Sequence, residues 1–460
     1  MHPFDDLTIE QFRQLVLALT EQLRSANERI ATQDAEIAAL RQQISGGPGP
    51  GSPAANEPPA WLKPNRPARP ETKRKKRDCA FTRPRGQATS EIEHAADYCP
   101  DCGRKLDGGT LHHTREVIDL PDATVQTVEH KFYTRYCGVC QKRIASKGDL
   151  QNQVVGKRRI GIRAMSFIAY LRTACRMTVE SICLLLDAQF GLKISAGEVS
   201  ELLSGVADVG APVAETLLDN IRNSPVVHAD ETGWREDGKN GYLWSFSTPD
   251  TRYFVRDASR GSDVVKEVLG AKFNGVLVTD FYSAYSFYPG EHQRCWVHLL
   301  RDLHHLREKH PDNGSVKMFI SDVRDVFDRA REYDGEKHTE ADRRKQRFVY
   351  QEELRRIARP FLKQPVPQRV LAERVERFAS ELFVFVEYEH APPDNNAAER
   401  AIRPAVVIRK VSGGTRTERG SETMAVLHSL FATWQLRGHD VLASFRLLLL
   451  GGLDPLGNPT

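Results

Sequence analysis

We expect the fold of this chain to be organised around SPVVHADETGWR, residues 224–235. The β-branched, apolar Val226 and Val227 begin a run that predicts a short buried strand, and the run ends on the carboxylate of Asp230. Because side chains alternate between the two faces of a strand, His228 and Asp230 are expected to share one face. A carboxylate at the end of a buried strand needs a metal ion or hydrogen-bond donors, although such an Asp often only forms a turn or a cap.

Two later stretches again set a carboxylate beside an ordered element. Residues 276–279 predict a strand that ends on Asp280. In PPDNNAAER, residues 392–400, two prolines followed by Asp and Asn predict a helix start, with Glu399 in an early turn and Pro404 at the helix end. A Glu there also favours the helix dipole without any other role. Together, three carboxylates on two strands and a helix suit two Mg2+ or Mn2+ ions, which activate a water or a 3′-hydroxyl for displacement at phosphorus.

The positions of these carboxylates indicate an RNase H-like α/β sheet. Further strands are expected at 242–248, 252–257 and 291–296, the last running into a helix at 299–307. Trp234 and Trp244 are expected to pack in the core, with stacking on a nucleobase as the alternative.

The composition indicates several domains and no membrane-spanning segment. The chain has 460 residues, 40% of them apolar and 27% charged, which exceeds a single core. No apolar run reaches about 18 residues, and the acidic start MHPFDDLTIE lacks an apolar signal region. Residues 63–85 hold ten Lys or Arg against two acids, which leaves the rest of the chain near −4 for a total of +4. Such a block favours a polyanion partner, or else a flexible solubilising linker.

A seven-residue repeat near the start predicts a coiled coil. Thr8 and Gln11 form a capping-box start, and nine of the eleven a and d positions are large and apolar. The a positions are Ile9, Val16, Leu23, Ile30, Ile37 and Ile44, and the d positions are Phe12, Leu19, Ala26, Gln33 and Leu40. The alternative is one helix packed on its own domain. The Pro- and Gly-rich linker that follows favours the coiled coil, because it separates the helix from the rest of the chain.

Two CxxC pairs predict one structural zinc site. Cys99 and Cys102 are separated by 34 residues from Cys137 and Cys140, and two such turns supply four thiolates for one tetrahedral Zn2+. The alternative is a redox pair or plain reduced thiols. The sequence between 116 and 133 alternates as strands do, and the basic surface of the module suits contact with a DNA backbone.

The region 160–222 is predicted to be helical. Helices are expected at 164–176, at 179–190 with Gly191 as the end, and from a Ser195 cap through residue 204. Helix, turn and capped helix in this order resemble a helix-turn-helix, which favours DNA binding, whereas simple helix packing gives the same pattern.

Two further groups of residues accompany the carboxylates. Cys295 and His298 form a CxxH pair that we expect to be structural and near Asp280, because two ligands alone do not make a zinc site. Cations that follow Glu399, with Gly413 and Gly414 among them, predict a track for DNA phosphates, with a solvated face as the alternative. These cations are Arg400, Arg403, Arg409, Lys410, Arg416 and Arg419, and the linker adds Lys73, Arg74, Lys75, Lys76 and Arg77 as expected DNA contacts.

With these motifs, the chain resembles a DDE transposase of the insertion sequence sixty-six family. The motifs are HADETGWR, VTDFYSAY, CWVHLLRDL, DNNAAERAIRP and RKVSGGTRTERG, and the resemblance extends from the heptads to about residue 445. It implies that Asp230, Asp280 and Glu399 are catalytic metal ligands on an RNase H-like core. It also implies a helical insertion before Glu399.

The expected organisation is multidomain, with mixed α and β structure. The expected parts are a coiled-coil dimerisation helix at 1–45, a basic linker at 46–90, a four-cysteine zinc module at 91–150, a helix-turn-helix-like segment at 151–223, the first part of the core at 224–310, a helical insertion at 311–385, the second part of the core at 386–450 and a tail at 451–460.

The expected function is metal-dependent cleavage at insertion-sequence ends and strand transfer into target DNA. Expected cofactors are two Mg2+ or Mn2+ ions per active site and one Zn2+ per chain. Expected partners are the terminal inverted repeats, target DNA, a second copy of the chain and small accessory proteins of the same element, in the bacterial cytoplasm and on the nucleoid when bound to DNA. The alternatives are a catalytically inactive DNA-binding regulator, against which the three intact acids argue, and a nuclease without strand joining.

Overall fold

The structure is a computed structural model of the 460-residue chain. It describes residues 86–146, 148–335, 337–454 and 457–458, together with Glu21 and Arg24. The predicted coiled coil therefore lies outside the described residues, apart from those two positions, and so do most of the linker with its five cations at 73–77 and part of the tail. The chain divides into two compact units, Met1–Ile118 and Asp119–Thr460.

Each unit carries one of the two cysteine turns. In the first unit, Tyr98 bridges Lys105 and the turn between them holds Cys99 and Cys102. In the second unit, the antiparallel hairpin of β1 (Thr134–Cys137) and β2 (Lys142–Ala145) holds the other pair. The strands predicted between 116 and 133 are wrong, since these described residues form no strand. Their side chains are mostly exposed, so the alternating pattern has no core against which to bury one face.

A five-stranded mixed sheet forms the centre of the second unit. Its strands lie in the order β5-β4-β3-β6-β7. The first three pair antiparallel, and β6 and β7 continue the sheet in parallel with β3. The bounds are β3 Val226–Gly233, β4 Tyr242–Ser247, β5 Arg252–Asp257, β6 Val276–Thr279 and β7 His292–Arg294. The five strands expected from the sequence are thus confirmed within one or two residues at most ends, whereas β3 runs three residues beyond Asp230.

Helices cover both faces of this sheet, as alternation of the strand side chains requires. Val227, Trp244 and Phe246 pack on one face against α5 (Ser262–Leu269) and the end of α4 (Ala196–Arg222). Leu243 and Phe254 pack on the other face against α11 (Asn396–Ser412) and α12 (Glu418–Leu436). Trp234 and Trp244 are both buried in these cores, which confirms the expectation of core packing.

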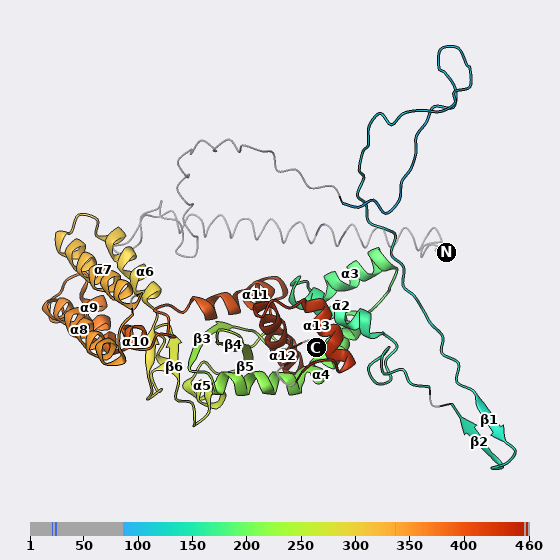
Figure 1. The fold of residues 1–460 in the computed structure, drawn as a ribbon. Coiled ribbons are helices and arrows are strands. Elements are labelled where there is room, and N and C mark those ends of the chain that lie inside the picture. The colour runs from blue at the N-terminus through green and yellow to red at the C-terminus, as the bar shows by residue number, and fades with distance from the viewer. Residues whose placement is uncertain are drawn as a thin grey trace. The chain divides into compact units, whose positions relative to one another are not determined.

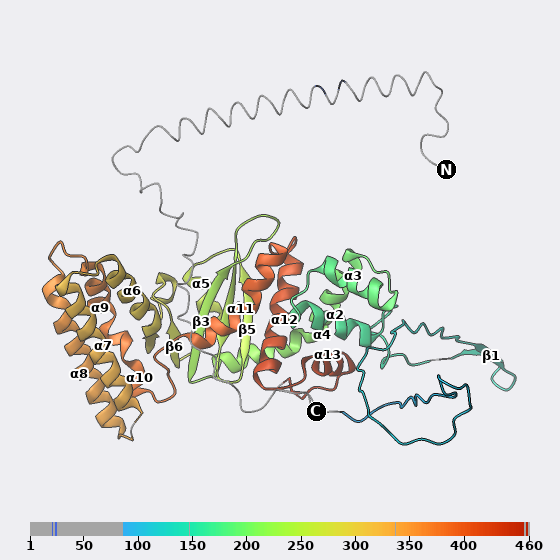
Figure 2. The ribbon, with the colours of Figure 1, turned by 90° about the horizontal axis from the view of Figure 1, so that it is seen from above.

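Two helical groups flank the sheet and lie at opposite ends of it in Figures 1 and 2. The first packs around one core and consists of α2 (Ile162–Thr173), α3 (Val179–Phe190), α4, α12 and α13 (Val441–Leu450). The second has a core of its own and consists of α6 (Trp296–Lys309), α7 (Gly314–Asp334), α8 (Glu340–Ala358), α9 (Arg369–Leu382) and α10 (Val384–Glu387). Short 3-10 turns occur at η1 (Ser283–Tyr285) and η2 (Arg359–Phe361). No helix of the described chain is long and apolar enough to cross a membrane.

Two helices extend beyond the ends predicted from the sequence, because buried side chains continue along them. The predicted stop at Pro404 is wrong: α11 continues to Ser412, since Ala405 and Ile408 beyond the proline are buried against the sheet. The helix capped by Ser195 runs to Arg222 instead of residue 204, because apolar side chains continue along its buried face. The cap itself is confirmed, with the Ser195 side chain accepting a hydrogen bond from the Glu198 N–H.

Candidate active site

Asp230 lies on β3, and Asp280 directly follows the neighbouring parallel strand β6. The register pairs Val226 with Val276 and His228 with Val278, so Asp230 and Asp280 each lie two residues past the last pair. Val226, Val276 and Val278 share one core on this face, which fixes the direction of the even-numbered side chains. Since neighbouring strands are about 4.8 Å apart, the two carboxylates are close neighbours.

The third acid comes to this face on helix α11. Ala398, Ala401 and Ile402 form the buried side of the first turns of this helix. The small alanines let the backbone approach the sheet closely, and Glu399 follows Ala398 at the border of the buried side, with about a third of its side chain exposed. Glu399 lines the same pocket as Asp230, and the charges of Asp280 and Glu399 both act on Asp230. That the three acids form one catalytic site stays a prediction.

Asn395 ties the start of α11 to strand β3. Its side chain lies within 3.1 Å of His228 Nδ1 and donates a 2.8 Å hydrogen bond to the carbonyl oxygen of Ala229. Its backbone N–H donates to Cys295 Sγ at 3.2 Å, and its carbonyl oxygen accepts from the N–H of Glu399. Asn395 is fully buried, so these bonds fix the position of the Glu399 turn relative to Asp230.

Negative charge accumulates around Asp230. Burial is the largest cause that raises its pKa, to about 7, and the charges of Glu231, Asp280 and Glu399 raise it further. One hydrogen bond, from the N–H of Glu231, acts in the opposite direction. An acid held this far above its ordinary range is poorly compensated, and a cation bound between the carboxylates would stabilise its ionised form.

Glu231 has a different role from its neighbour Asp230. Its side chain is buried and accepts hydrogen bonds from Arg260 at 2.6 and 3.0 Å and from the Tyr285 hydroxyl. Arg260 in turn stacks on the ring of Tyr282, 3.9 Å from its centroid. Successive strand residues point to opposite faces of the sheet. Glu231 therefore bonds to Arg260 and Tyr285 on one face, while Asp230 points to the other face, toward α11.

Two pockets lie along helix α11, one at Asp230 and Glu399 and one near the end of the helix. The first, of about 330 Å3, is lined by Asp230, Asn396, Glu399, Arg400, Ile402, Arg403 and Val406. The second, of about 490 Å3, is lined by Gly233, Trp234, Arg235, Asn240, Gly241, Tyr242, Arg409 and Gly413. Cationic side chains therefore border both pockets.

The six cations expected to contact DNA fall into two classes. Arg409 is half-buried and donates to the carbonyl oxygen of Gly233 at 2.8 Å, and Arg419 pairs with Asp208 of α4. The others are exposed and form no ion pair with the described part of the chain; these are Arg400, Arg403, Lys410 and Arg416. The exposed class leaves its charge available to a ligand, whereas Arg409 and Arg419 also hold elements together.

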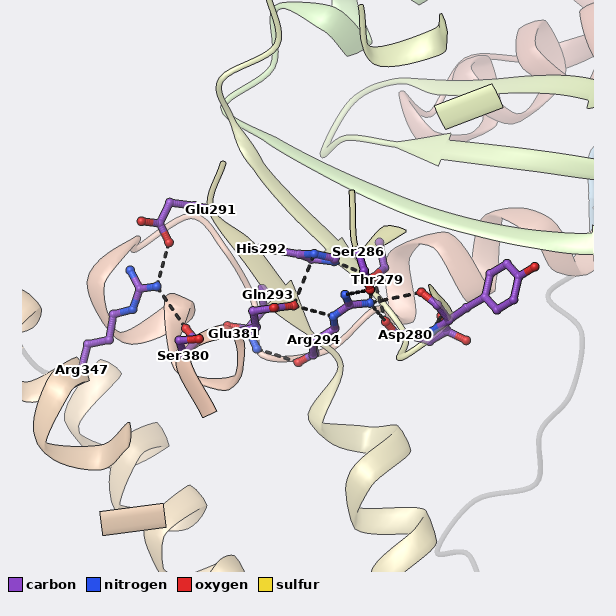
Figure 3. Close-up of polar contacts among 11 residues, drawn as sticks. Thr279, Asp280, Ser286, Glu291, His292, Gln293, Arg294, Arg347, Ser380 and Glu381 are labelled. Carbon is purple, nitrogen blue, oxygen red and sulfur yellow. Dashed lines mark hydrogen bonds and ion pairs between the residues drawn. The ribbon is translucent and has the colours of Figure 1, made fainter. Parts of the chain in front are cut away.

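A buried arginine connects Asp280 to the second helical group (Figure 3). Arg294, fully buried on β7, donates to the carbonyl oxygen of Asp280 at 2.8 Å and to Ser286 Oγ at 3.0 Å. Its Nε also donates to Glu381 of α9 at 2.7 Å. His292 lies between the same Glu381 carboxylate and Thr279. The loop after β6 is therefore held from the side of the helical insertion.

Comparison with known proteins identifies the family. The family model described as Transposase IS66 family matches residues 157–423, which is more than half of the chain and includes Asp230, Asp280 and Glu399. The chain belongs to this family. Over 289 residues it is 24% identical to the uncharacterized protein y4qI of Sinorhizobium fredii (strain NBRC 101917 / NGR234), covering 55% of this chain and 52% of that protein. Over 287 residues it is 27% identical to the uncharacterized protein y4jD of the same strain, covering 56% of each. The chain spans about half the length of these curated relatives.

The four cysteines of this IS66-family chain lie outside the matched region. In each CxxC turn, two backbone N–H groups point to the first sulfur and lower the pKa of that thiol, at Cys99 and at Cys137. The N–H of Cys140, for example, lies 3.4 Å from Cys137 Sγ. Such N–H donors support metal-bound thiolates. The two pairs belong to different units, so a zinc ion shared by all four cysteines stays a prediction.

Two residues that position this site were missed from the sequence. Asn395 lies in the DNNAAER motif, which was the only feature of the sequence that pointed to it. Its hydrogen-bond partners His228 and Ala229 are more than 160 residues away in the chain, so the sequence does not reveal these bonds. Arg294 belongs to His-Gln-Arg, a strand of three polar residues that are all buried. The sequence predicts the strand itself at 291–296, but nothing in the sequence indicates that Arg294 is buried and reaches the Asp280 carbonyl.

Proposed function

We propose that this chain is a DDE transposase that cleaves DNA at the ends of an insertion sequence and joins the freed ends to target DNA. The observation that carries the proposal is the parallel register of β3 with β6, which aligns Asp230 on β3 with Asp280 directly after β6, while α11 brings Glu399 into the pocket of Asp230. The strand order, with three antiparallel strands followed by two parallel ones, supports an RNase H-like core. Membership in a transposase family supports action on DNA.

The residues present fit Mg2+ or Mn2+, and we expect two ions per site. Asp230, Asp280 and Glu399 would hold them, since carboxylate oxygens are the ligands that these ions prefer. The raised pKa of Asp230 indicates an uncompensated cluster of acids, and Glu399 Oε1 is buried without a hydrogen-bond donor from the described residues. When bound, such ions activate a water or a 3′-hydroxyl and stabilise the leaving oxygen.

The protein side chains bind and orient the DNA in this proposal. Arg400 and Arg403 border the pocket of Asp230 and Glu399, where they would bind phosphates next to the scissile one. Asn395 keeps the turn of Glu399 in place against β3, and Arg294 does the same for the backbone of Asp280. Hydrolysis and strand transfer are both in-line displacements at phosphorus, so one site serves both steps.

Other parts of the chain would bring two DNA ends together. The coiled coil at 1–45 would join two copies, and the linker cations at 73–77 would bind DNA. The four-cysteine module with one Zn2+ and the helices α2 to α4 would hold the terminal repeats. We expect the protein to act on the nucleoid in the bacterial cytoplasm, with small accessory proteins of the element.

The test is strand transfer with the full chain, labelled DNA that carries the inverted repeats of the element, a supercoiled target and Mg2+ or Mn2+. We expect joined product, a decrease of about a hundredfold or more for Glu399→Gln and for Asp280→Asn, and DNA binding like the wild type. The matched control is Asp322→Asn, an exposed acid on α7. Binding without product, with the accessory proteins present, would favour an inactive regulator. Cleavage without joining would indicate a nuclease.

A further inference from the structure

Three side chains of metal-binding type converge where helices α6 and α11 begin. Cys295 is the residue that precedes α6, His298 lies in the first turn of α6, and Glu399 lies in the first turn of α11. One ligand atom from each lies within 4.8 Å of the other two. The distance from His298 Nε2 to Glu399 Oε1 is 3.7 Å, which is too long for a hydrogen bond.

The sulfur of Cys295 is surrounded by N–H donors. Asn395 N lies 3.2 Å from Sγ, and the backbone N–H groups of His298 and Val297 also point to it. The CxxC turn of Cys137 directs N–H groups to its first sulfur in the same way. The CxxH turn therefore directs backbone N–H donors to its sulfur as the CxxC turn does, and such donors stabilise negative charge on a metal-bound sulfur.

Two polar atoms of the residues that converge here have no hydrogen-bond partner in the described part of the chain. These atoms are Glu399 Oε1 and His298 Nδ1, and both are buried. Buried polar atoms without partners are rare in native proteins and call for an explanation such as an ion. The carboxylate oxygen faces the imidazole without bonding to it, which is the arrangement of two ligands around a common cation.

We propose that Cys295, His298 and Glu399 bind one divalent cation that favours sulfur and nitrogen ligands, such as Zn2+. Tetrahedral zinc holds such ligand atoms about 3.3 to 3.6 Å apart, so small rotations of the half-buried His298 and Glu399 side chains complete the site. The Cys295 thiol loses its proton to solvent when the metal binds. Three protein ligands leave a fourth position open to water or another donor.

This cation site differs from the two kinds of metal site proposed above, the Mg2+ centre of the three carboxylates and the Zn2+ site of the four cysteines. The Mg2+ centre offers only oxygen ligands, and the CxxC module offers only sulfur. Glu399 belongs both to the mixed site and to the Mg2+ centre, so a bound Zn2+ withdraws a carboxylate oxygen from catalysis and inhibits cleavage. This effect on activity rests on the proposed function, whereas metal binding does not.

Co2+ titration of the full chain tests the binding, because thiolate ligands give Co2+ an intense near-ultraviolet absorption band. We expect Cys295→Ser to bind one Co2+ per chain fewer than the wild type, with a weaker band. If the serine variant does not fold, His298→Asn tests the same site, because His298 is half-exposed and its replacement disturbs the core less. We expect this variant to lose the same Co2+ ion. Cys183→Ser, at a half-buried cysteine of α3, is the matched control and should bind as the wild type does. Wild-type stoichiometry in both site variants would overturn the proposal.

Inhibition of cleavage separates this proposal from the proposed function. In Mg2+, we expect half-inhibition of Cys295→Ser to need about tenfold more Zn2+ than half-inhibition of the wild type. Equal inhibition would mean that Zn2+ acts elsewhere and would overturn the inhibitory role. Loss of Co2+ in the variants without any cleavage by the wild type would leave the metal site standing and refute the transposase chemistry. Cleavage by the wild type together with wild-type Co2+ binding in the variants would support the transposase chemistry and refute the metal site.

Discussion

His428 places an ionisable ring among buried aromatic side chains of the second unit. It lies on α12 between the rings of Phe254 and Phe431 and is fully buried. Burial is the main cause that lowers its pKa from 6.5 to about 3. Because the unfolded chain binds the proton first as pH falls, the stability that depends on the neutral ring is complete above pH 6.5 and is lost progressively toward pH 3.

This titration predicts acid sensitivity. Between pH 7 and pH 5, the free energy of unfolding of the wild type should fall by about 2 kcal/mol more than that of His428→Gln, which has no group to titrate. Urea unfolding at several pH values measures the difference. Parallel pH dependences for the two proteins would show that His428 is not held neutral.

At the same scale, the sequence predicts acids better than their partners. Asp230, Asp280 and Glu399 each stand beside a recognisable strand or helix start, so local pattern is enough to find them. Asn395 and Arg294 act through bonds to residues far away in the chain or on another element. Which polar side chain reaches which carbonyl depends on how the elements pack, and a single sequence does not contain that information.

At the level of secondary-structure elements, the turn that follows α11 requires a glycine at position 414 more strictly than at position 413. Gly414 has φ +119°, and a Cβ there would lie 2.1 Å from the carbonyl oxygen of Arg235. That carbonyl accepts the N–H of Thr415, which joins the turn to the end of β3. Gly413 also has a positive φ, +76°, but a Cβ there meets nothing within 4 Å. The sequence predicted that these glycines let a DNA phosphate approach the backbone closely. At Gly414, the group that approaches closely is instead the backbone of Arg235.

The pair of glycines gives a matched experiment. Gly413→Ala should cost about 1 kcal/mol of unfolding free energy from its backbone conformation alone. Gly414→Ala should cost clearly more, about 3 kcal/mol, because the backbone of Arg235 must also move. Chemical denaturation of the two variants beside the wild type measures both. Equal losses would mean that the turn adapts to the added methyl group.

Element boundaries follow packing more than local signals. Short strands such as β5 and β6 were predictable because apolar residues and turn residues coincide there. Pro404 and the glycines of α4 mark no helix end, since buried side chains continue on the same helix face beyond them. In contrast, the alternating stretch at 116–133 forms no strand without a core to cover it. Whether a segment finds such a core is decided by the remainder of the chain.

Across the second unit, polar contacts join the helical insertion to the sheet through β7. Arg294 reaches from β7 to Glu381, and Arg347 of α8 reaches to Glu291 at 2.7 Å and to the carbonyl oxygen of Ser380 (Figure 3). The second helical group has an apolar core of its own, against which Phe281 of the Asp280 loop packs. Its polar contacts through β7 therefore help to hold the loop of Asp280 in place.

Arg294→Lys tests this connection, because it keeps the charge but removes the planar fork that reaches several acceptors. The loss of contacts to the Asp280 carbonyl and Glu381 should lower the unfolding free energy by about 3 kcal/mol. With Asp280 less well held, half-maximal cleavage should also need more Mg2+. Arg329→Lys is the control: Arg329 pairs with Asp325 and Glu353 on the exposed side of α7, so we expect a loss of about 1 kcal/mol or less and an unchanged Mg2+ requirement. If Arg294→Lys were less stable but needed no more Mg2+ than the wild type, the arginine would support the fold without positioning the loop of Asp280.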